Sequence, residues 1–276
     1  MSTQGAMMEL SPRQSEILAA ARTRGRVSVD QLASTFEVTP QTIRRDLNDL
    51  CTRGLLARVH GGAVPARSVS NVTYDQRRGL AASAKQNIGL AAARLIPNNC
   101  SVIINIGTTT EQVARALYDH RDLIVISNNI NVINILSGSP RKDLILAGGT
   151  VRQTDGGIVG EAAVEFMGQF KADYAVIGAS SLDKDGSVLD FDIREVSVAR
   201  TIVKSARQTI LVADNSKFGR TASVRVCNIT DVASFVTDAP PPPAFREMCR
   251  AQGVDVIVAS NEDEFSYSEM NVNEHA

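Results

Sequence analysis

Residues 39 to 62 read Thr-Pro-Gln-Thr-Ile-Arg-Arg-Asp-Leu-Asn-Asp-Leu-Cys-Thr-Arg-Gly-Leu-Leu-Ala-Arg-Val-His-Gly-Gly, and this stretch decides the fold of the N-terminal part of the chain. Thr39 is a good N-cap because its hydroxyl can accept a backbone N–H, and Pro40 suits the first helical position. We therefore predict a helix from Pro40 to about Thr52. Its apolar residues recur at spacings of four and three, which gives the helix one packing side, formed by Ile43, Leu47 and Leu50.

Two shorter helices are predicted upstream. Ser11-Pro12 opens the first, which should end near Gly25. Ser28, with Gln31 three residues later, forms a capping-box pattern for the second, which should end at Glu37-Val38. Three short helices with a tight turn between the second and the third make a helix-turn-helix, whose third helix lies in the major groove of DNA.

A short hairpin follows the third helix. Residues 55–60 alternate as a strand, and Gly61-Gly62 turns the chain back to form a wing. An Arg-Arg pair on a helix is usually only a solvated surface, but the complete order of capped helices, turn and wing favours DNA binding. The candidate DNA contacts are Thr39, Gln41, Thr42, Arg44, Arg45, Asn48, Arg58 and His60.

Charge and composition agree with a DNA-binding part joined to a larger domain. Residues 1–85 hold 12 Lys or Arg against 7 Asp or Glu, a net of +5, whereas the remainder holds 17 against 23, a net of -6. The basic part should meet nucleic acid. The four cysteines form no CxxC pair, so we expect neither a zinc site nor a disulfide framework. No signal sequence or bilayer-spanning apolar run is evident, and we expect a cytoplasmic protein without membrane contact.

The rest of the chain alternates between β and α patterns. We predict a winged helix-turn-helix domain over 1–64, a polar linker over 65–84, an α/β domain with a mostly parallel sheet over 85–260 and a disordered tail over 261–276. The predicted strands are 101–106, 123–127, 144–147, 174–178, 209–213, 234–237 and 254–258. The predicted helices are 85–95, 111–117, 132–136, 162–169, 195–205 and 245–252.

Small and polar residues gather where these strands end. Gly107-Thr108-Thr109-Thr110 lies between a strand and a helix, where backbone N–H groups and hydroxyls can hold a phosphate, although such a turn is more often a simple helix cap. Asn128 and Gly148 follow the next two strands. Three successive strand ends of this kind indicate one pocket along the carboxyl edge of the sheet.

Charged residues lie at two further strand ends. Lys217 follows a strand and can supply a cation to a phosphorylated ligand, or it can be an ordinary solvated lysine. Most carboxylates between Asp183 and Glu195 are expected to be loop residues in water. Glu195 differs because it opens a helix and can accept hydrogen bonds from the hydroxyls of a polyol.

The N-terminal segment resembles the DNA-binding domain of the DeoR family of bacterial transcription regulators. The resemblance rests on Arg13 with Ile17, on Val27-Ser28-Val29, on the block from Val38 to Leu47, and on Arg58 with His60 to Ala63. The block from Val38 to Leu47 is the specific part. The resemblance implies an operator-binding protein. Paired half-sites require at least a dimer, and the resemblance suggests a homotetramer, so we expect a homo-oligomer that is a dimer or a tetramer.

The stretch from about Tyr74 to Asp238 resembles the sensor domain of the same family, which is similar in fold to sugar-phosphate isomerases. By this resemblance Thr108, Thr109, Thr110 and Lys217 would contact phosphate, and Asn128, Gly148, Asp183 and Glu195 would surround a polyol, with Asn105 and Gly107 in the same loop region. Two departures stand out: Asn105 replaces the family's Asp, and Ala199 precedes Arg200 where the family has Lys.

Four runs resemble family members that control glycerol and glycerol 3-phosphate genes: Thr154 to Ala162, Leu189 to Asp192, Ser216 to Arg220 and Thr237 to Pro242. The first and the last of these runs are the most specific. They imply a repressor released by glycerol 3-phosphate, with no cofactor. Alternatives are a repressor that senses another phosphorylated sugar or polyol, and an isomerase. An isomerase needs a carboxylate base beside the substrate, which Glu195 or Asp183 could nominally supply, but no paired general acid is identifiable. We therefore assign no catalytic residues and expect a non-enzyme.

Overall fold

The computed structural model describes residues 10–24, 27–52, 55–59, 61–65 and 74–259. The chain divides into two compact units, Met1–Ser70 and Asn71–Ala276, and each is described by itself. His60 and the predicted disordered tail, 261–276, lie outside the described residues. Within the described part, no helix is both long enough and apolar enough to cross a membrane.

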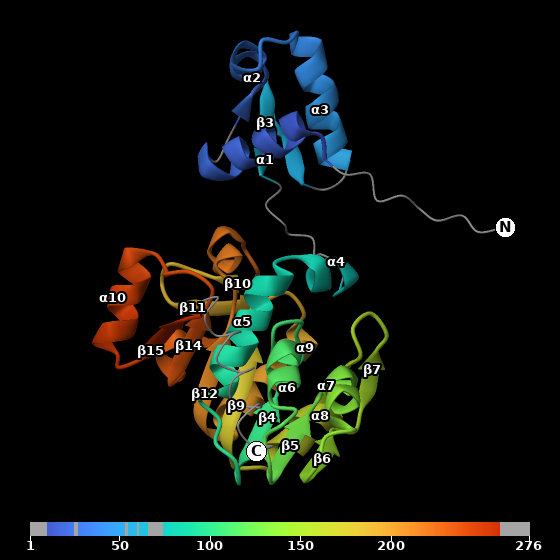
Figure 1. Ribbon diagram of the computed structural model, residues 1–276, viewed down its shortest axis with the longest axis vertical. Coiled ribbons are helices and arrows are strands. Elements are labelled where there is room, and N and C mark those ends of the chain that lie inside the picture. Colours follow the sequence, from blue (N-terminus) through green and yellow to red (C-terminus); the bar gives the residue numbers. More distant parts are fainter. Residues whose placement is uncertain (1–9, 25–26, 53–54, 60, 66–73, 260–276) are drawn as a thin grey trace, which may run out of the picture. The chain divides into compact units, whose positions relative to one another are not determined.

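The N-terminal unit contains the predicted helix-turn-helix and wing (Figure 1). Its elements are α1 (Pro12–Arg24), β1 (Val27–Ser28), α2 (Val29–Thr35), α3 (Pro40–Thr52), β2 (Leu56–Val59) and β3 (Gly62–Pro65). The strands form an antiparallel sheet in the order β1-β3-β2. The two-residue strand β1 was not predicted, because Ser28 also caps α2 and only the cap is visible in the sequence.

The predicted caps start α2 and α3. The Ser28 hydroxyl accepts a hydrogen bond from the backbone N–H of Gln31, and the Thr39 hydroxyl accepts one from the N–H of Thr42, both at 3.2 Å. The tight turn between the helices contains Glu37 with a φ of 51°, in the left-handed region. The three predicted apolar residues of α3, Ile43, Leu47 and Leu50, are fully buried.

Polar contacts fix the orientation of α3 against α1. The Arg13 Nε donates to Asp46 Oδ2 at 2.6 Å, and the Gln14 side chain donates to Asp49 at 3.0 Å. Asp46 is buried although it lies in the basic stretch of α3. Arg13 and Asp46 therefore position the helix, while the arginines at 44 and 45 are exposed.

Gly62 permits the close approach of β3 to β1. A Cβ at this position would lie 2.0 Å from the carbonyl oxygen of Val27, and this clash is with backbone. We expect Gly62→Ala to destabilise the N-terminal unit by about 1–3 kcal/mol or more, since overpacking against backbone cannot be relieved by a side-chain rotation. Hydrogen exchange followed by mass spectrometry should show faster exchange in residues 12–65 and unchanged exchange in residues 74–259.

Gly148→Ala is the matched control, because a Cβ at Gly148 meets nothing within 4 Å. Exchange in residues 12–65 that is as slow in Gly62→Ala as in the control would contradict the predicted clash.

The C-terminal unit is built on a seven-stranded parallel sheet in the order β15-β14-β12-β9-β4-β5-β6. The strands are β4 (Ser101–Ile104), β5 (Leu123–Ser127), β6 (Lys142–Leu146), β9 (Ala172–Gly178), β12 (Ala206–Val212), β14 (Ser234–Thr237) and β15 (Asp255–Val258). All seven were predicted, with small shifts at their ends. The topological switch point lies between β4 and β9, since the chain extends the sheet from β4 to one side through β5 and from β9 to the other side through β12.

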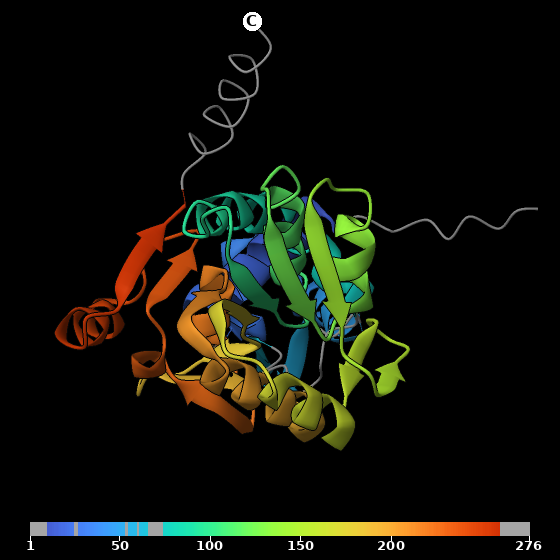
Figure 2. The ribbon, with the colours of Figure 1, turned by 90° about the horizontal axis from the view of Figure 1, so that it is seen from below.

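Helices cover both faces of this sheet, as Figures 1 and 2 show. On one face lie α5 (Ala82–Ala93), α6 (Thr110–Ala116) and α7 (Ile130–Leu136), and on the other α8 (Glu161–Gly168), α9 (Ile193–Lys204) and α10 (Pro243–Ala251). Successive residues of the buried strands contribute to two separate cores: Val102 and Ile104 pack under α5 and α6, whereas Ile103 packs on the α8 and α9 side. The fold is the predicted α/β class.

Two features of this unit were not predicted. Short antiparallel strands decorate the sheet: β7 (Thr150–Arg152) with β8 (Gly157–Val159), and β10 (Ser181–Leu182) with β11 (Ser187–Asp190) and β13 (Val224–Asn228). Residues 65–84, assigned to a linker from the sequence, contain the helix α4 (Tyr74–Gly79) and the start of α5. The sequence of α4 is polar and has no apolar periodicity, so the helix could not be recognised from a pattern. Polar side-chain contacts, such as that of Tyr74 with Glu111, hold it in place instead.

Candidate effector site and DNA interface

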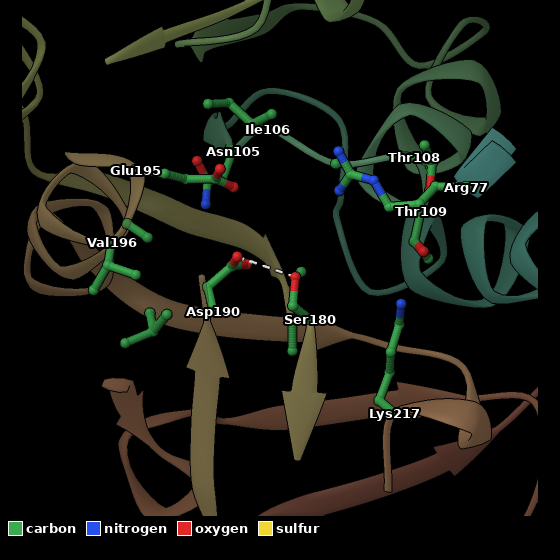
Figure 3. Close-up of a pocket in the computed structure, with 15 residues that line it drawn as sticks. Arg77, Asn105, Ile106, Thr108, Thr109, Ser180, Asp190, Glu195, Val196 and Lys217 are labelled. Atoms are coloured by element: carbon green, nitrogen blue, oxygen red, sulfur yellow. Dashed lines mark hydrogen bonds between the residues drawn. The ribbon is translucent and has the colours of Figure 1, made fainter. Parts of the chain in front are cut away.

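A cavity opens at the carboxyl ends of β4, β9 and β12, beside the switch point of the sheet (Figure 3). It holds about 510 Å³ of space outside the protein atoms, part of which is open to solvent. The lining residues come from α4, the loop after β4, the loop after β9, β11, α9, the loop after β12 and β13: Arg77, Asn105, Ile106, Gly107, Thr108, Thr109, Gly178, Ala179, Ser180, Asp190, Glu195, Val196, Ala199, Lys217 and Val226.

The loop from Asn105 to Thr110 forms one wall. Gly107 has a φ of 154°, so the chain turns here in a conformation that favours glycine. The Thr110 hydroxyl is fully buried and hydrogen-bonds the carbonyl oxygens of Asn105 at 2.7 Å and Gly107 at 2.8 Å. Thr108 and Thr109 line the cavity, whereas Thr110, which the resemblance implied as a phosphate contact, instead holds the loop in shape.

Lys217 enters the cavity from the opposite wall, and in Figure 3 its side chain points toward Thr109. It lies on the 3-10 helix η1 (Asn215–Gly219), which Asp214 caps by accepting from the N–H of Ser216 at 3.1 Å. Burial lowers the pKa of Lys217 to about 8, and the charges of Arg220, Lys85 and Arg77 act in the same direction against the attraction of Asp214. The ammonium lies 3.7 Å from Asp214, so it is only weakly paired.

Carboxylates form a third wall. Glu195 lies in the first turn of α9, and burial together with the charge of Asp190 raises its pKa to about 7, against the effect of Arg152. Asp190 accepts a hydrogen bond from the Ser180 hydroxyl at 3.0 Å. The cavity therefore has a cationic side at Lys217 and Arg77 and an acidic side at Asp190 and Glu195.

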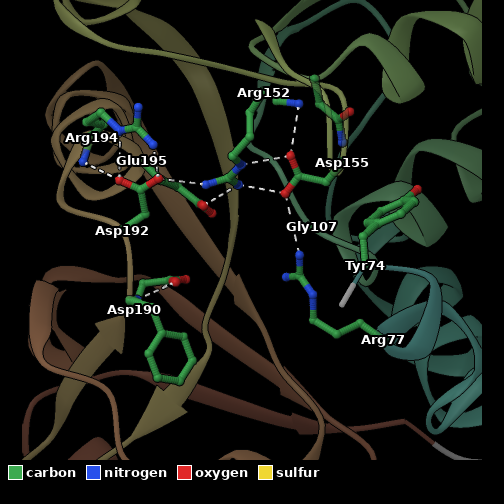
Figure 4. Close-up of polar contacts among 12 residues, drawn as sticks. Tyr74, Arg77, Gly107, Arg152, Asp155, Asp190, Asp192, Arg194 and Glu195 are labelled. Carbon is green, nitrogen blue, oxygen red and sulfur yellow. Dashed lines mark hydrogen bonds and ion pairs between the residues drawn. The ribbon is translucent and has the colours of Figure 1, made fainter. Parts of the chain in front are cut away.

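Arg152 on β7 connects the acidic wall to other elements (Figure 4). Its guanidinium contacts three carboxylates: Asp155 at 2.6 Å, Asp192 at 3.1 Å and Glu195 at 2.5 Å. Arg77 of α4 reaches the same Asp155 at 3.4 Å. Side chains from α4, the β7–β8 hairpin and the start of α9 thus share one ion-pair network at the edge of the cavity.

Six of the ten residues predicted for ligand binding line the cavity together: Asn105, Gly107, Thr108, Thr109, Glu195 and Lys217. Four do not. Thr110 lies behind the loop, and the buried Asn128 donates to the carbonyl of Ile158 at 3.1 Å. Gly148 is exposed, and the exposed Asp183 closes the turn between β10 and β11. Asn128 and Gly148 satisfy the strand-end rule, but Asn128 is buried by neighbouring segments and Gly148 is exposed to solvent. Asp183 follows β10, which is not part of the parallel sheet.

The sequence reasoning missed Arg77, Ser180 and Asp190. Arg77 was placed in a linker, and a contact between residues 78 positions apart leaves no local pattern. Ser180 follows the strand β9 by two residues, and this strand-end signal could have identified it. Asp190 was noted as one carboxylate of an acidic loop and as part of the Leu189 to Asp192 run, but not as a residue of the ligand site.

The outer side of α3 carries most of the predicted DNA contacts. Gln41, Arg44, Arg45 and Asn48 are exposed there. The hydroxyls of Thr39 and Thr42 lie 2.9 Å apart and bond each other at the start of the helix. Arg58 lies on the wing strand β2, and its side chain, like His60, is outside the described part of the chain.

Two family models match the chain. The DeoR-like helix-turn-helix domain matches residues 13–69, and the DeoR C terminal sensor domain matches residues 80–239. Together they include α3, the wing and the residues of the cavity other than Arg77.

Among similar proteins are two glycerol-3-phosphate regulon repressors. The one from Escherichia coli (strain K12) is 43% identical over 235 residues, which cover 85% of this chain and 93% of that protein. The one from Haemophilus influenzae is 44% identical over 230 residues, covering 83% and 90%. A solved ribose 5-phosphate isomerase from Plasmodium falciparum aligns at 14% identity with a TM-score of 0.37, over 49% of this chain and 52% of that one.

Proposed function

This chain belongs to the DeoR family of transcription regulators, and we propose that it represses genes of glycerol and glycerol 3-phosphate metabolism and leaves its operators when glycerol 3-phosphate binds. The observation that carries the proposal is the division of the cavity into a cationic and an acidic side, in a chain that also exposes two adjacent arginines on the third helix of a helix-turn-helix. The names of the two regulon repressors support this choice of effector.

The cationic side suits a phosphate. Lys217 supplies a weakly paired ammonium, and Thr108 and Thr109 supply hydroxyls and backbone N–H groups across the cavity from it. Hydrogen bonds to a charged group contribute about 1.5–3 kcal/mol each, more than neutral ones. A phosphoryl group that bridges Lys217 and the Thr108 loop therefore dominates the binding free energy.

The acidic side suits hydroxyl groups. Glu195 and Asp190 are acceptors, and the Oδ1 of Asn105 is buried without a hydrogen-bond partner among the described residues. A buried acceptor left unpaired costs about 1–3 kcal/mol, so a ligand hydroxyl that donates to it is favoured. A second carboxylate or phosphate at this end would meet like charge. The effector class is accordingly a monophosphorylated polyol.

We propose that the effector acts by a population shift in a homo-oligomer, a dimer or a tetramer, that binds operator DNA with paired N-terminal units. An effector lowers operator affinity only by binding the non-competent arrangement more tightly. The operator-binding residues of this proposal are Arg44, Arg45 and Asn48, with Gln41 beside them.

Gel shifts on the DNA upstream of the chain's own gene and of neighbouring operons test this function. Glycerol 3-phosphate should release a salt-sensitive complex, and glycerol should not, since it offers no charge to Lys217. Calorimetry with glycerol 3-phosphate, ribose 5-phosphate, glycerol and inorganic phosphate ranks the effectors directly. Turnover of ribose 5-phosphate by the protein, or release by glycerol alone, would contradict the proposal.

The lowered pKa of Lys217 predicts a pH dependence. Because the charged ammonium is the form that binds phosphate, affinity for glycerol 3-phosphate should fall above about pH 8, approaching tenfold per pH unit. The same shift has the opposite sign for folding: the unfolded chain binds the proton more tightly, so this group makes the free protein more stable as pH rises from about 8 to 10.5. Calorimetry between pH 7 and pH 9.5 measures the first effect.

Lys217→Arg is the control for this titration, since a guanidinium stays charged throughout that range. Its affinity should be flat above about pH 8, beyond the titration of Glu195, whose pKa is about 7. An equal fall in both proteins would mean that another group titrates.

A further inference from the structure

Arg77 lines the cavity, and its guanidinium has fewer hydrogen-bond partners than it can use. Its Nη2 lies 3.4 Å from Asp155 Oδ2, a long contact, and its Nε is buried without a hydrogen-bond partner within the described part of the chain. Asp155 is already held by Arg152, through Nε at 2.9 Å and Nη2 at 2.6 Å. The guanidinium of Arg77 is therefore under-satisfied, and it faces the cavity that the proposed function assigns to a phosphate (Figures 3 and 4).

The helix that carries Arg77 is tied to the cavity walls at both ends. At its start, the Tyr74 hydroxyl lies 2.9 and 2.8 Å from the two carboxylate oxygens of Glu111, the residue that follows Thr110 in α6. At its end, the buried Lys85 ammonium donates to the carbonyl oxygens of Arg77 and Leu80. A change at the Thr108 loop thus reaches α4 by a second route, through Glu111 and Tyr74.

Helix α4 lies at the start of the C-terminal unit, next to the segment that leads to the DNA-binding unit. Tyr74 is the first described residue after the segment 66–73, which connects the DNA-binding unit to the C-terminal unit. Any displacement of α4 is therefore applied directly to the end of that connecting segment. The other residues of the cavity all lie further along the chain, most of them in the loops that follow β4, β9 and β12.

We propose that Arg77 is both a phosphate ligand and the residue that reports effector binding to the DNA-binding unit: its guanidinium exchanges the long contact with Asp155 for the effector phosphate, and α4 moves with it. This inference rests on the proposed function. Asp155 loses little in the exchange, because Arg152 continues to neutralise it. The phosphate gains a bidentate donor that Lys217 cannot provide.

The test compares Arg77→Gln with Arg78→Gln, a variant with the same charge change on the same helix whose side chain is exposed and stacks over the Tyr74 ring at 5.9 Å. Calorimetry gives the affinity for glycerol 3-phosphate, and gel shifts give operator affinity without effector and at saturation. We expect Arg77→Gln to bind the effector about ten times more weakly and, even when saturated, to keep most of its operator affinity. Arg78→Gln should behave as wild type in both measurements.

In the proposed exchange, Asp155 and the effector phosphate compete for Arg77, and Asp155→Asn weakens the first of these competitors. The amide is neutral and holds Arg77 less tightly, so effector affinity should rise about threefold and release should need less effector. If the contact between Arg77 and Asp155 served only to stabilise the fold, its loss would not raise the affinity for glycerol 3-phosphate. Circular dichroism melting of all three variants checks that the fold is retained.

The outcomes separate the two proposals. Wild-type protein that no phosphorylated polyol removes from the operator overturns the proposed function and this inference with it. If glycerol 3-phosphate releases wild-type protein from the operator and also fully releases saturated Arg77→Gln protein, the inference alone is overturned. The same holds if Arg78→Gln protein shows the defect expected of Arg77→Gln.

Discussion

Lys217→Ala protein should stay on operator DNA at glycerol 3-phosphate concentrations that remove the wild-type protein. The variant loses a charge-assisted contact worth about 1.5–3 kcal/mol, which corresponds to about a ten- to hundredfold weaker effector affinity. Lys217 lies in the C-terminal unit, so operator affinity without effector should be unchanged. In cells, target-gene transcription should remain low when glycerol is supplied. Calorimetry and gel shifts measure the two affinities separately.

Removal of the buried Lys217 also leaves Asp214 without its partner at 3.7 Å, so the melting temperature of the variant must be measured first. Lys184→Ala is the matched control, since Lys184 is an exposed lysine in the turn between β10 and β11. A folded Lys217→Ala protein that is released at the wild-type glycerol 3-phosphate concentration would sink the phosphate-site assignment.

Arg44→Ala and Arg45→Ala should each weaken operator binding and leave effector binding intact. Both side chains are exposed on α3, whose opposite side carries the buried Ile43, Leu47 and Leu50. A bidentate contact to a base contributes about 1–3 kcal/mol of discrimination, and a lost phosphate contact lowers the slope of log affinity against log salt by about one. Gel shifts at several salt concentrations, on operator and on unrelated DNA, distinguish these two roles.

Arg250→Ala serves as the control, because Arg250 is an exposed arginine of α10 that pairs with Glu247 of the same helix. It removes the same charge from the protein without touching α3. Operator affinity equal to wild type in both Arg44→Ala and Arg45→Ala would show that α3 is not the recognition helix.

Local chemistry explains why so much of the fold could be predicted. The caps at Ser28 and Thr39 and the apolar spacing of α3 are set by neighbours within a few residues, and all of them are present in the structure. The parallel strands were recognisable as short buried apolar runs, such as Val102 to Ile104. The strand β10 has two residues, too few for an alternation to be visible, and the sequence of β11, Ser187-Val188-Leu189-Asp190, does not alternate.

The cavity was harder to predict because it depends on which strand ends meet. The rule that ligands bind at the carboxyl edge correctly brought Thr108, Thr109 and Lys217 together. The rule does not specify the strand order, and the switch point lies between β4 and β9 rather than along β5 and β6. Asn128 and Gly148, at the ends of β5 and β6, are therefore outside the cavity, and the contact from Arg77 to Asp155 could not be anticipated from local sequence.

The N-terminal unit is closed by contacts that leave it little freedom to change shape. Strand β3 pairs with β1 directly before α2, and Arg13 pins α3 to α1 through Asp46. Induction under the proposed mechanism thus alters the distance between the recognition helices of neighbouring subunits and leaves each helix as it is. How strongly the effector releases an operator then depends on the number of base pairs between its half-sites. Isolated half-sites should be read equally well by the free and the effector-bound protein.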